Sequence, residues 1–573
     1  MTMIILKHFR HGVMKPLLCA MPVLALTSCN DFLDTLPLND VVLENYWTQK
    51  ADVKSVLNSC YESLEAPESI TRMAVWGELR SDNIVQGRSV GQDLSDLLKE
   101  NLLPTNSFTK WDIMYQTINR CNTVCHYAPQ VMDKDPNYTE GEMRGNVAEA
   151  AFMRDLCYFY LIRTFRDIPL TFEPSIDNGR NYDIAPTPMN DALDSLIADL
   201  KSVENYAVRR YVDDSRMTNS EAASKAPENS SRVTRVAVWA LLADINLWRG
   251  NYDECIDYCN KVIDFKKEQY RLKKENIGDL NDMMELYGIP LLREKNDGAT
   301  LSGSAYGQIF GVGNSFESLF ELHFRNNQSV SNSFVNSYYG STSQPLGYFA
   351  APSVHCKDAV LGNCKLYAKN DCRVYENMAS VNNRYAIKKY VFANVSLDNS
   401  NVSDMRSLRL TTSARGNAYA NWIVYRLTDV LLMKAEALVE KGGDDNFATA
   451  FSMVNAVNKR ARCLTDGAAK DTLVFNDYKS SREKMEQLVM EERNRELMFE
   501  GKHWYDLVRM ALRDGDNQRL VSEATVKYED NVNAIKIKLA DPNILFFPYN
   551  RDELRLNRFL QQNSAYSDTE EFE

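Results

Sequence analysis

The clearest pattern along the chain is a run of apolar side chains spaced by three and four residues. It occupies positions 150, 153, 157, 160, 161 and 165. This spacing places the apolar residues on one face of an α-helix, which turns once every 3.6 residues. The pattern ends at Asp167-Ile168-Pro169, where proline stops a helix. The spacing therefore predicts an amphipathic helix over Glu149–Phe165.

A second run with the same period predicts a helical hairpin. Its first arm extends from Val233 to Leu247 and is followed by the turn Arg249-Gly250-Asn251. The second arm extends from Tyr252 to Ile263. The Leu-x-x-Gly-x-Tyr spacing across this turn is typical of a tetratricopeptide repeat. We therefore expect two antiparallel helices joined by a short turn.

A further hairpin is predicted near the C-terminus, from Val424 to Leu438, across Gly442-Gly443, and on to Phe447–Val457. Weaker periodicity at residues 44–65 and 111–126 suggests additional helix pairs. Several such pairs packed side by side form a solenoid. The predicted fold class is thus all-α dominated, with an α-solenoid-like scaffold of tetratricopeptide-type hairpins.

The composition of the chain changes between residues 277 and 420, where helical periodicity fades and Gly, Ser, Asn and Tyr become frequent. Ordering so many loop residues costs roughly 1 to 2 kcal/mol each, so long loop-rich segments in compact proteins are usually functional. We expect a scaffold formed by residues 29–276 and 421–573, and a ligand-binding insert over 277–420.

The N-terminus has the features of a bacterial lipoprotein signal. Basic Lys7, Arg10 and Lys15 precede a short apolar stretch, and Leu26-Thr27-Ser28-Cys29 closes it. We expect residues 1–28 to be removed and Cys29 to carry acyl chains. Two or three chains, each burying about 0.8 kcal/mol per CH₂, hold a protein on a membrane stably. The expected membrane attachment is this lipid anchor alone.

Charge and cysteine content exclude several classes of function. The net charge of −12 disfavours nucleic acid as a partner. Twelve cysteines in 573 residues are too sparse for a disulfide scaffold, and their spacing matches no four-ligand zinc site. Acidic turns at 443–446 and 514–517 do not continue into calcium-binding EF-hand loops. We expect no metal and no cofactor.

The sequence contains no evident set of catalytic residues. Glu492, Glu496 and Glu500 lie four residues apart on one predicted helix, and a glycosidase does use a pair of carboxylates. Arg493 and Arg495 stand beside them, so structural ion pairing explains the spacing better. The six histidines form no metalloprotease or triad motif. We therefore expect no catalytic residues and a protein that is not an enzyme.

Several segments together give the chain a resemblance to a known family. They are Asn30 to Pro37 after the lipidated cysteine, Trp76 to Asn83, Trp111 to Tyr115, the helix over 149–165 with Asp167 to Leu170, Tyr425 to Val430, Glu491 to Arg509, and the end of the chain from Phe547 to Tyr566. In these segments the chain resembles the SusD/RagB family of surface nutrient-binding lipoproteins. The resemblance covers nearly all of the chain after the signal.

The resemblance implies a location and a partner. Members of the family sit on the outer membrane, facing the exterior, as a lid on a SusC-like TonB-dependent transporter. Most bind an oligosaccharide ligand, and the RagB branch handles peptides. The chain departs from the usual family pattern at His503, where arginine is common, and at Phe547-Pro548. The implied function is capture of oligosaccharides and their delivery to the transporter.

Sugar binding calls for aromatic faces beside amides, carboxylates or guanidinium groups. In the insert, the candidate stacking residues are Tyr306, Tyr338, Tyr339 and Tyr348. The alternative is that these rings pack the insert onto the helices. By resemblance, the loop after Trp76 approaches the ligand, and it contributes the candidates Arg80, Asp82 and Asn83.

Three other functions remain open at the level of sequence. The protein could capture peptides, as the RagB branch does; it could be a lipid-anchored glycosidase; or it could be a structural lid of the transporter with negligible affinity for a ligand. Charged pockets for peptide termini would favour the first, and product formation from a polysaccharide would favour the second. A strong transporter complex without any ligand would favour the third.

Overall fold

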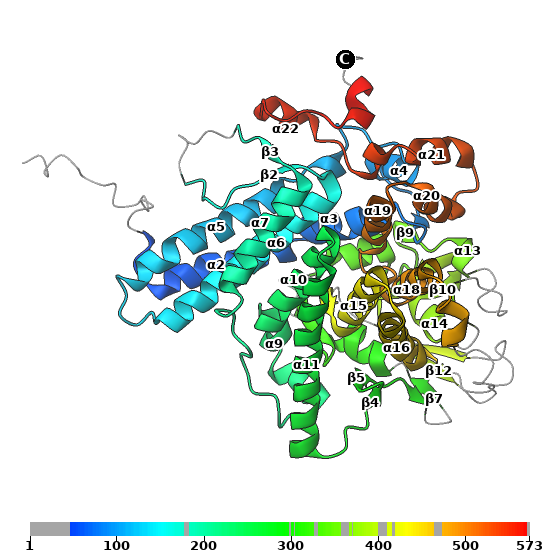
Figure 1. Ribbon diagram of the computed structural model, residues 1–573, viewed down its shortest axis with the longest axis horizontal. Helices are drawn as coiled ribbons and strands as arrows, with labels where there is room; N and C mark the ends of the chain where they lie inside the picture. Colours follow the sequence, from blue (N-terminus) through cyan, green and yellow to red (C-terminus); the bar gives the residue numbers. More distant parts are fainter. Residues whose placement is uncertain are drawn as a thin grey trace, which may run out of the picture. The chain divides into compact units, whose positions relative to one another are not determined.

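The computed structural model describes residues 46–176, 183–296, 300–302, 304–325, 331–356, 366–368, 371–398, 409–414, 419–462 and 473–569 (Figure 1). The chain divides into two compact units, Met1–Trp47 and Thr48–Glu573, and the helices and strands given below belong to the second. Cys29 and the predicted signal lie outside the described residues. Within the described residues, no helix combines the length and apolarity needed to cross a membrane.

Helix α6 (Glu140–Phe165) is enclosed by protein over most of its length, with every residue from Ala148 to Phe165 buried. It packs against α2 (Lys50–Glu65), α5 (Asp112–Met132) and α7 (Met189–Val203). The predicted helix is confirmed, but it begins nine residues earlier. Its first turns are polar and carry no apolar period, and the start is fixed instead by a capping box between Thr139 and Glu142.

Both predicted hairpins are present. The first consists of α10 (Arg235–Arg249) and α11 (Tyr252–Ile277), joined through Gly250 in the left-handed conformation. The second consists of α15 (Leu427–Lys441) and α16 (Asp444–Ala461). Helices α11 and α15 pack together, so the two hairpins lie side by side (Figure 1). The helix-dominated, solenoid-like arrangement is thus confirmed.

One boundary of the second hairpin was predicted wrongly. Val424 belongs to strand β14 (Trp422–Arg426) and not to the helix that follows. All five residues of this strand are buried. A short, continuously buried apolar segment can belong to either structure, and periodicity alone does not decide between them. Strand β14 pairs antiparallel with β8 (Ser318–Leu322).

The segment from residue 277 to 420 contains more regular structure than its composition suggests. A four-stranded antiparallel sheet has the order β13-β12-β7-β6, and two separate hairpins join β4 to β5 and β10 to β11. The strands are β4 (Met283–Leu286), β5 (Ile289–Leu292), β6 (Lys295–Asn296), β7 (Thr300–Ser302), β10 (Met378–Val381), β11 (Arg384–Ile387), β12 (Phe392–Asp398) and β13 (Arg409–Ala414).

Two strand pairs connect the insert to the scaffold. One is the β8–β14 pair, in which Leu322 lies opposite Trp422 and Ser318 opposite Arg426. The other joins β1 (Val85–Gln86) to β9 (Phe349–Ala350). Because both pairs use backbone hydrogen bonds, they fix the position of the insert independently of its side chains.

The remaining elements that precede β8 are α3 (Pro67–Glu78), α4 (Gln92–Leu98), η2 (Ser107–Thr109), β2 (Ile168–Pro169), β3 (Pro186–Thr187), α8 (Asn219–Lys225), α9 (Glu228–Ser231), α12 (Ser304–Tyr306) and η3 (Gly307–Val312). Those that follow β8 are η4 (Val335–Tyr339), α13 (Ser353–Cys356), α14 (Arg373–Asn377), α17 (Phe475–Tyr478), α18 (Arg482–Leu497), α19 (His503–Asp514), α20 (Gln518–Ala524), η6 (Thr525–Lys527), α21 (Val532–Leu539), η7 (Pro542–Leu545), α22 (Arg551–Leu556) and η8 (Ser564–Thr569).

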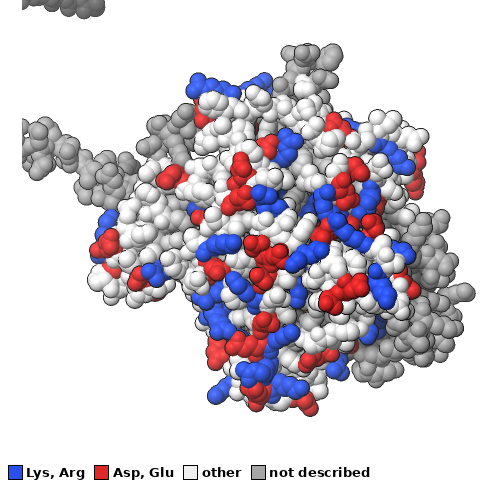
Figure 2. Space-filling view, in the orientation of Figure 1, with Lys and Arg blue, Asp and Glu red and all other residues white. Residues whose placement is uncertain are grey.

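Charged side chains of both signs are interspersed over the face of the molecule in Figure 2. Several form pairs one helical turn apart, such as Arg271 with Glu275 at 2.6 Å and Lys225 with Glu221 at 3.0 Å. Such exposed pairs contribute little to stability, about 0 to 1 kcal/mol each.

Candidate ligand-binding surface

Arg80, a predicted ligand contact, is fully buried. Its Nε donates to Glu100 at 2.8 Å, and its two terminal nitrogens donate to the carbonyl oxygens of Leu545 and Ile544 at 3.0 and 2.9 Å. Its guanidinium lies 4.3 Å from the centre of the Trp504 ring. With all three nitrogens bonded within the protein, Arg80 fastens the C-terminal segment to the turn after α3 and offers no free edge to a ligand.

Asp82 and Asn83 are also interior residues. The carboxylate of Asp82 lies 2.8 Å from Nε2 of His503 and 3.1 Å from Nε2 of His355. The side-chain amide of Asn83 donates a hydrogen bond to Glu78 at 2.8 Å. Burial alone would raise the pKa of Asp82, but the two imidazoles lower it well below its ordinary value. The expected contacts of these residues with a ligand are thus replaced by contacts within the protein, because the turn is covered by α13 and α19.

Tyr306 and Tyr339 lie in the core of the insert. The hydroxyl of Tyr306 donates to the carbonyl of Lys388 at 3.1 Å, and that of Tyr339 donates to the carbonyl of Phe499 at 2.7 Å. The Tyr339 ring is fully buried and stacks on Tyr390. For these two residues the alternative interpretation holds: their rings pack inside the protein and do not form a binding surface.

Tyr338 and Tyr348 differ from them, because both are only half-buried. Their ring centroids lie 5.2 Å apart in an edge-to-face arrangement. Phe334 stacks on Tyr338 at 4.7 Å, and Phe349 meets Tyr338 at 5.1 Å, so the ring is supported from behind. The structure thus brings two of the seven predicted ligand contacts together at a surface.

Arg88 completes this surface, although no sequence pattern pointed to it. Its guanidinium carbon lies 4.1 Å from the centre of the Tyr348 ring, and its Nη2 donates to the carbonyl of Ser337 at 3.2 Å. Its backbone N–H donates to Gly347 at 2.9 Å. We call Arg88, Tyr338 and Tyr348 the tyrosine platform.

Close backbone approach shapes the platform. A Cβ atom on Gly347 would lie 2.2 Å from the carbonyl oxygen of Tyr338, and one on Gly87 would lie 2.4 Å from the carbonyl oxygen of Gly347. Only glycine allows the chain to pass at this distance. The two segments that carry the platform, residues 87–88 and 337–348, are therefore held in contact by their backbones.

The platform offers the chemistry that sugars require. Two aromatic side chains present apolar surface, and one guanidinium is fixed beside them as a hydrogen-bond donor. The cation of Arg72, on α3, lies near Tyr338, whose pKa is nevertheless raised because burial outweighs it. The exposed Gln86 and Gln344 add amide groups in the neighbouring segments.

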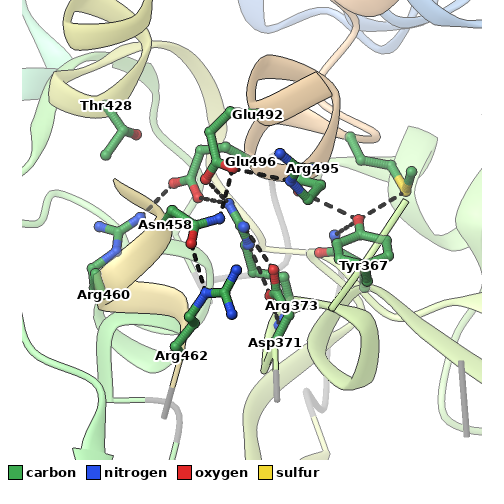
Figure 3. A network of polar contacts seen from close by, with 12 residues as sticks. Tyr367, Asp371, Arg373, Thr428, Asn458, Arg460, Arg462, Glu492, Arg495 and Glu496 are labelled. Carbon is green, nitrogen blue, oxygen red and sulfur yellow. Dashed lines mark hydrogen bonds and ion pairs between the residues drawn. The ribbon is translucent and has the colours of Figure 1, made fainter. Parts of the chain in front are cut away.

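The carboxylates considered for catalysis are neutralised by cations, and Figure 3 shows two of them, Glu492 and Glu496, beside arginines. Glu496 is paired with Arg373 at 3.0 Å, with Arg426 at 2.6 Å and with Arg460. Burial alone would raise the pKa of Glu496, but these arginines lower it well below its ordinary value. A carboxylate held ionised in this way cannot act as a proton donor.

Glu492 and Glu500 have similar surroundings. Glu492 meets Arg373 at 2.8 Å and Arg495 at 3.0 Å, while Glu500 meets Lys389 and Arg426, both at 2.7 Å. Most of these partners come from distant parts of the chain, where sequence reasoning did not find them. Among the described residues, no group of three or more His, Cys, Asp or Glu side chains is arranged to hold a metal ion.

Comparison with known proteins agrees with this architecture. A family described as "SusD family" matches residues 325–566, and one described as "Starch-binding associating with outer membrane" matches residues 31–247. The SusD-like proteins P38 and P2 of Formosa agariphila are 24% and 25% identical to the chain. The matches cover 84% and 86% of this chain, and 88% and 89% of the relatives.

Solved structures show the same fold. A SusD superfamily protein from Bacteroides vulgatus aligns with a TM-score of 0.64 at 18% identity, over 91% of this chain and 100% of its own. A laminarin-binding SusD-like protein aligns with a TM-score of 0.59 at 18% identity, with the same coverage of each chain. These structures show the fold, and the two family models, which match residues 31–247 and 325–566, show that the chain belongs to the SusD/RagB family.

Proposed function

We propose that this protein captures an oligosaccharide at the tyrosine platform and passes it to a SusC-like TonB-dependent transporter in the outer membrane. The observation that carries the proposal is the pair of half-buried rings, Tyr338 and Tyr348, with Arg88 fixed against one of them. The two tyrosines of the platform lie on the insert that we expected to bind the ligand, and Arg88 comes from the scaffold. A SusD-like neighbour of the same fold is described as laminarin-binding, which supports a glycan as the ligand class.

Roles within the proposed site follow from burial. Tyr338 and Tyr348 stack on the sugar, and Arg88 donates to its hydroxyl groups. The buried Tyr306, Tyr339, Arg80, Asp82 and Asn83 support the surrounding structure. This assignment narrows the seven sequence candidates to two direct contacts and adds Arg88.

The proposed mechanism is binding without covalent chemistry. It is supported by the ion pairs that neutralise Glu492, Glu496 and Glu500. Acyl chains on Cys29 would hold the protein at the membrane, facing the exterior, so that a captured sugar is close to the transporter. The family description, which refers to association with the outer membrane, supports this location.

The proposal is tested by calorimetric titration of the protein from residue 30 onward with laminarin, starch and xylan oligosaccharides and with mixed peptides. Replacing Tyr348 with alanine removes one of the two aromatic rings of the platform, and with it a surface on which a sugar can stack. We expect Tyr348→Ala to weaken glycan binding by about 1 to 3 kcal/mol, or about 5- to 150-fold in Kd.

Tyr206→Ala is the control, because Tyr206 is a surface tyrosine, 40% exposed, that also carries an arginine, Arg144, 4.8 Å from its ring centre. It should leave the affinity unchanged. Equal losses in both variants would contradict the platform. Peptide binding alone would favour the RagB-like function, and a transporter complex without any ligand would favour a structural lid.

A further inference from the structure

A second cavity lies between helices α2 and α6, away from the residues of the platform. Its volume is about 900 Å³. The two helices run in the same direction, because Lys54 meets Glu142 at 3.7 Å and, two turns later, Tyr61 meets Glu149 at 2.5 Å. We call the cavity along this interface the α2–α6 groove. In Figure 1 both helices lie in the blue and cyan part of the molecule.

Two glycines keep the groove open. Gly141 and Gly145 lie one turn apart on α6, and both line the cavity. A Cβ atom on Gly141 would meet no atom within 4 Å, and one on Gly145 would make only an ordinary contact with Val208 at 3.6 Å. Packing therefore does not require glycine at either position, although glycine inside a helix is destabilising relative to alanine. The effect of both is to leave part of the α6 wall without side chains.

One turn after Gly145 on α6, the groove is lined by a fixed set of planar polar groups centred on Glu149. Glu149, which is buried, accepts hydrogen bonds from Tyr61 and from two nitrogens of Arg232, at 2.5 and 3.2 Å. The Arg232 guanidinium also lies 4.0 Å from the centre of the Tyr211 ring. These contacts hold Arg232 in one orientation, while its side chain remains 39% exposed. A ligand in the groove would meet a donor that is already ordered.

The charge of the groove limits which ligands it accepts. Five carboxylates line it against three cationic side chains, and Glu62, Glu65 and Glu228 lie at the end away from Lys54. Burial raises the pKa of Glu65 to about 7. An anionic ligand would be repelled by this excess of carboxylates. A neutral ligand rich in hydroxyl groups would find acceptors and donors in the same cavity, including the amide of Asn58.

We propose that the α2–α6 groove is a second binding site of this protein and takes a neutral oligosaccharide. The proposal extends the function proposed above, but the groove shares no residue with the tyrosine platform. Its volume is within the range of about 300 to 1,000 Å³ that is typical of small-ligand sites.

The experiment blocks the groove and removes a ring of the platform in separate variants. Gly141→Leu together with Gly145→Leu places two side chains in the cavity, and Gly141→Ala with Gly145→Ala is the matched control that adds only Cβ atoms. Each pair is made in the wild-type chain from residue 30 and in the Tyr348→Ala background. Circular dichroism and thermal melting confirm that every variant is folded. The probes are neutral malto-, laminari- and xylo-oligosaccharides and, for comparison, anionic oligogalacturonates.

We expect the Tyr348→Ala protein to keep one site for a neutral probe and the leucine pair to weaken that site at least 10-fold. The alanine pair should bind as its parent does, and oligogalacturonates should bind the groove at least 10-fold more weakly. A single site that Tyr348→Ala abolishes would overturn the groove and leave the platform standing. Binding that the leucine pair removes and Tyr348→Ala does not would support the groove alone. No binding of any probe to the wild type would overturn both.

Discussion

Among single residues, Asp82 of the predicted ligand loop is held between two histidines. Its carboxylate lies between His355 of α13 and His503 of α19, and all three side chains are buried. An isolated carboxylate in such a place would be costly, and the imidazoles offset that cost. The side chain thus joins the insert to the C-terminal helices. This role is structural, and it explains why an acidic residue next to a tryptophan motif need not contact a ligand.

The pairing of Asp82 with His503 predicts a pH dependence of stability. Burial alone would lower the pKa of His503, but Asp82 raises it to about 9. A group with a raised pKa contributes stability that is complete below its unfolded pKa, about 6.5, and is lost as the pH rises through 9. We expect the wild type to exceed His503→Gln in unfolding free energy by on the order of 3 kcal/mol at pH 6, and by much less at pH 9.5.

Urea unfolding at a series of pH values measures this difference. His126→Gln is a suitable control, because His126 is on α5 and has no part in the Asp82 cluster. A difference between wild type and His503→Gln that stays constant from pH 6 to 9.5 would contradict the proposed charge pairing.

Among elements, the ion-pair network around α18 connects parts of the chain that are distant in sequence. Glu496 of α18 meets Arg460 of α16 and Arg373 of α14 (Figure 3). It also meets Arg426 of β14. Removing one partner of a buried pair leaves the others uncompensated, which costs about 3 to 5 kcal/mol. We expect Glu496→Gln to lower the unfolding free energy by about this amount in urea titrations.

Glu491→Gln provides the comparison on the same helix. The Glu491 side chain is 45% exposed and lies 3.5 Å from Arg495, so its loss should cost about 1 kcal/mol or less. Similar effects of the two substitutions would show that the buried network does not hold these elements together.

The helices were more predictable than the strands. The hairpins α10–α11 and α15–α16 follow from their apolar period and from glycine at each turn. Strand β14 and the strands of the insert could not be predicted in this way, because a short buried strand has no distinctive period and its partner lies far away in the sequence. For β14 that partner is β8, about 100 residues earlier. The loop-rich appearance of residues 277–420 reflects composition, whereas their strand pairing depends on tertiary contacts.

At the scale of the whole molecule, the proposed capture depends on attachment to the membrane. A single acyl chain gives only reversible binding, and two or three give stable anchoring. We expect Cys29→Ser to move most of the protein from the membrane fraction to the supernatant, as judged by immunoblotting after fractionation. Cys19→Ser, within the same predicted signal, should leave the distribution unchanged. Retention of Cys29→Ser at the membrane would contradict the lipid anchor.

The candidate site was predictable in location more than in detail. Glycine- and tyrosine-rich sequence indicated the insert, and Tyr338 and Tyr348 do reach a surface there. The sequence could not separate them from Tyr306 and Tyr339, because adjacent tyrosines in a loop have the same chemistry until packing buries one of them. Arg88 was missed because it reaches the platform only through the pairing of β1 with β9.

The pairing of β8 with β14 has a consequence for how such a protein can diverge. It brings Ser318 opposite Arg426, so about 100 residues of chain leave the scaffold and return to it at one point. The entropy of closing a loop grows only slowly with its length, by about 0.6 kcal/mol for each doubling. Residues between the two strands that make no buried contact with the helices can therefore be lengthened, shortened or exchanged at small cost, whereas ion pairs tie Arg373 to Glu496 of α18 and Lys389 to Glu500. Under the proposed function, specificity can evolve at these positions while the helical scaffold stays the same.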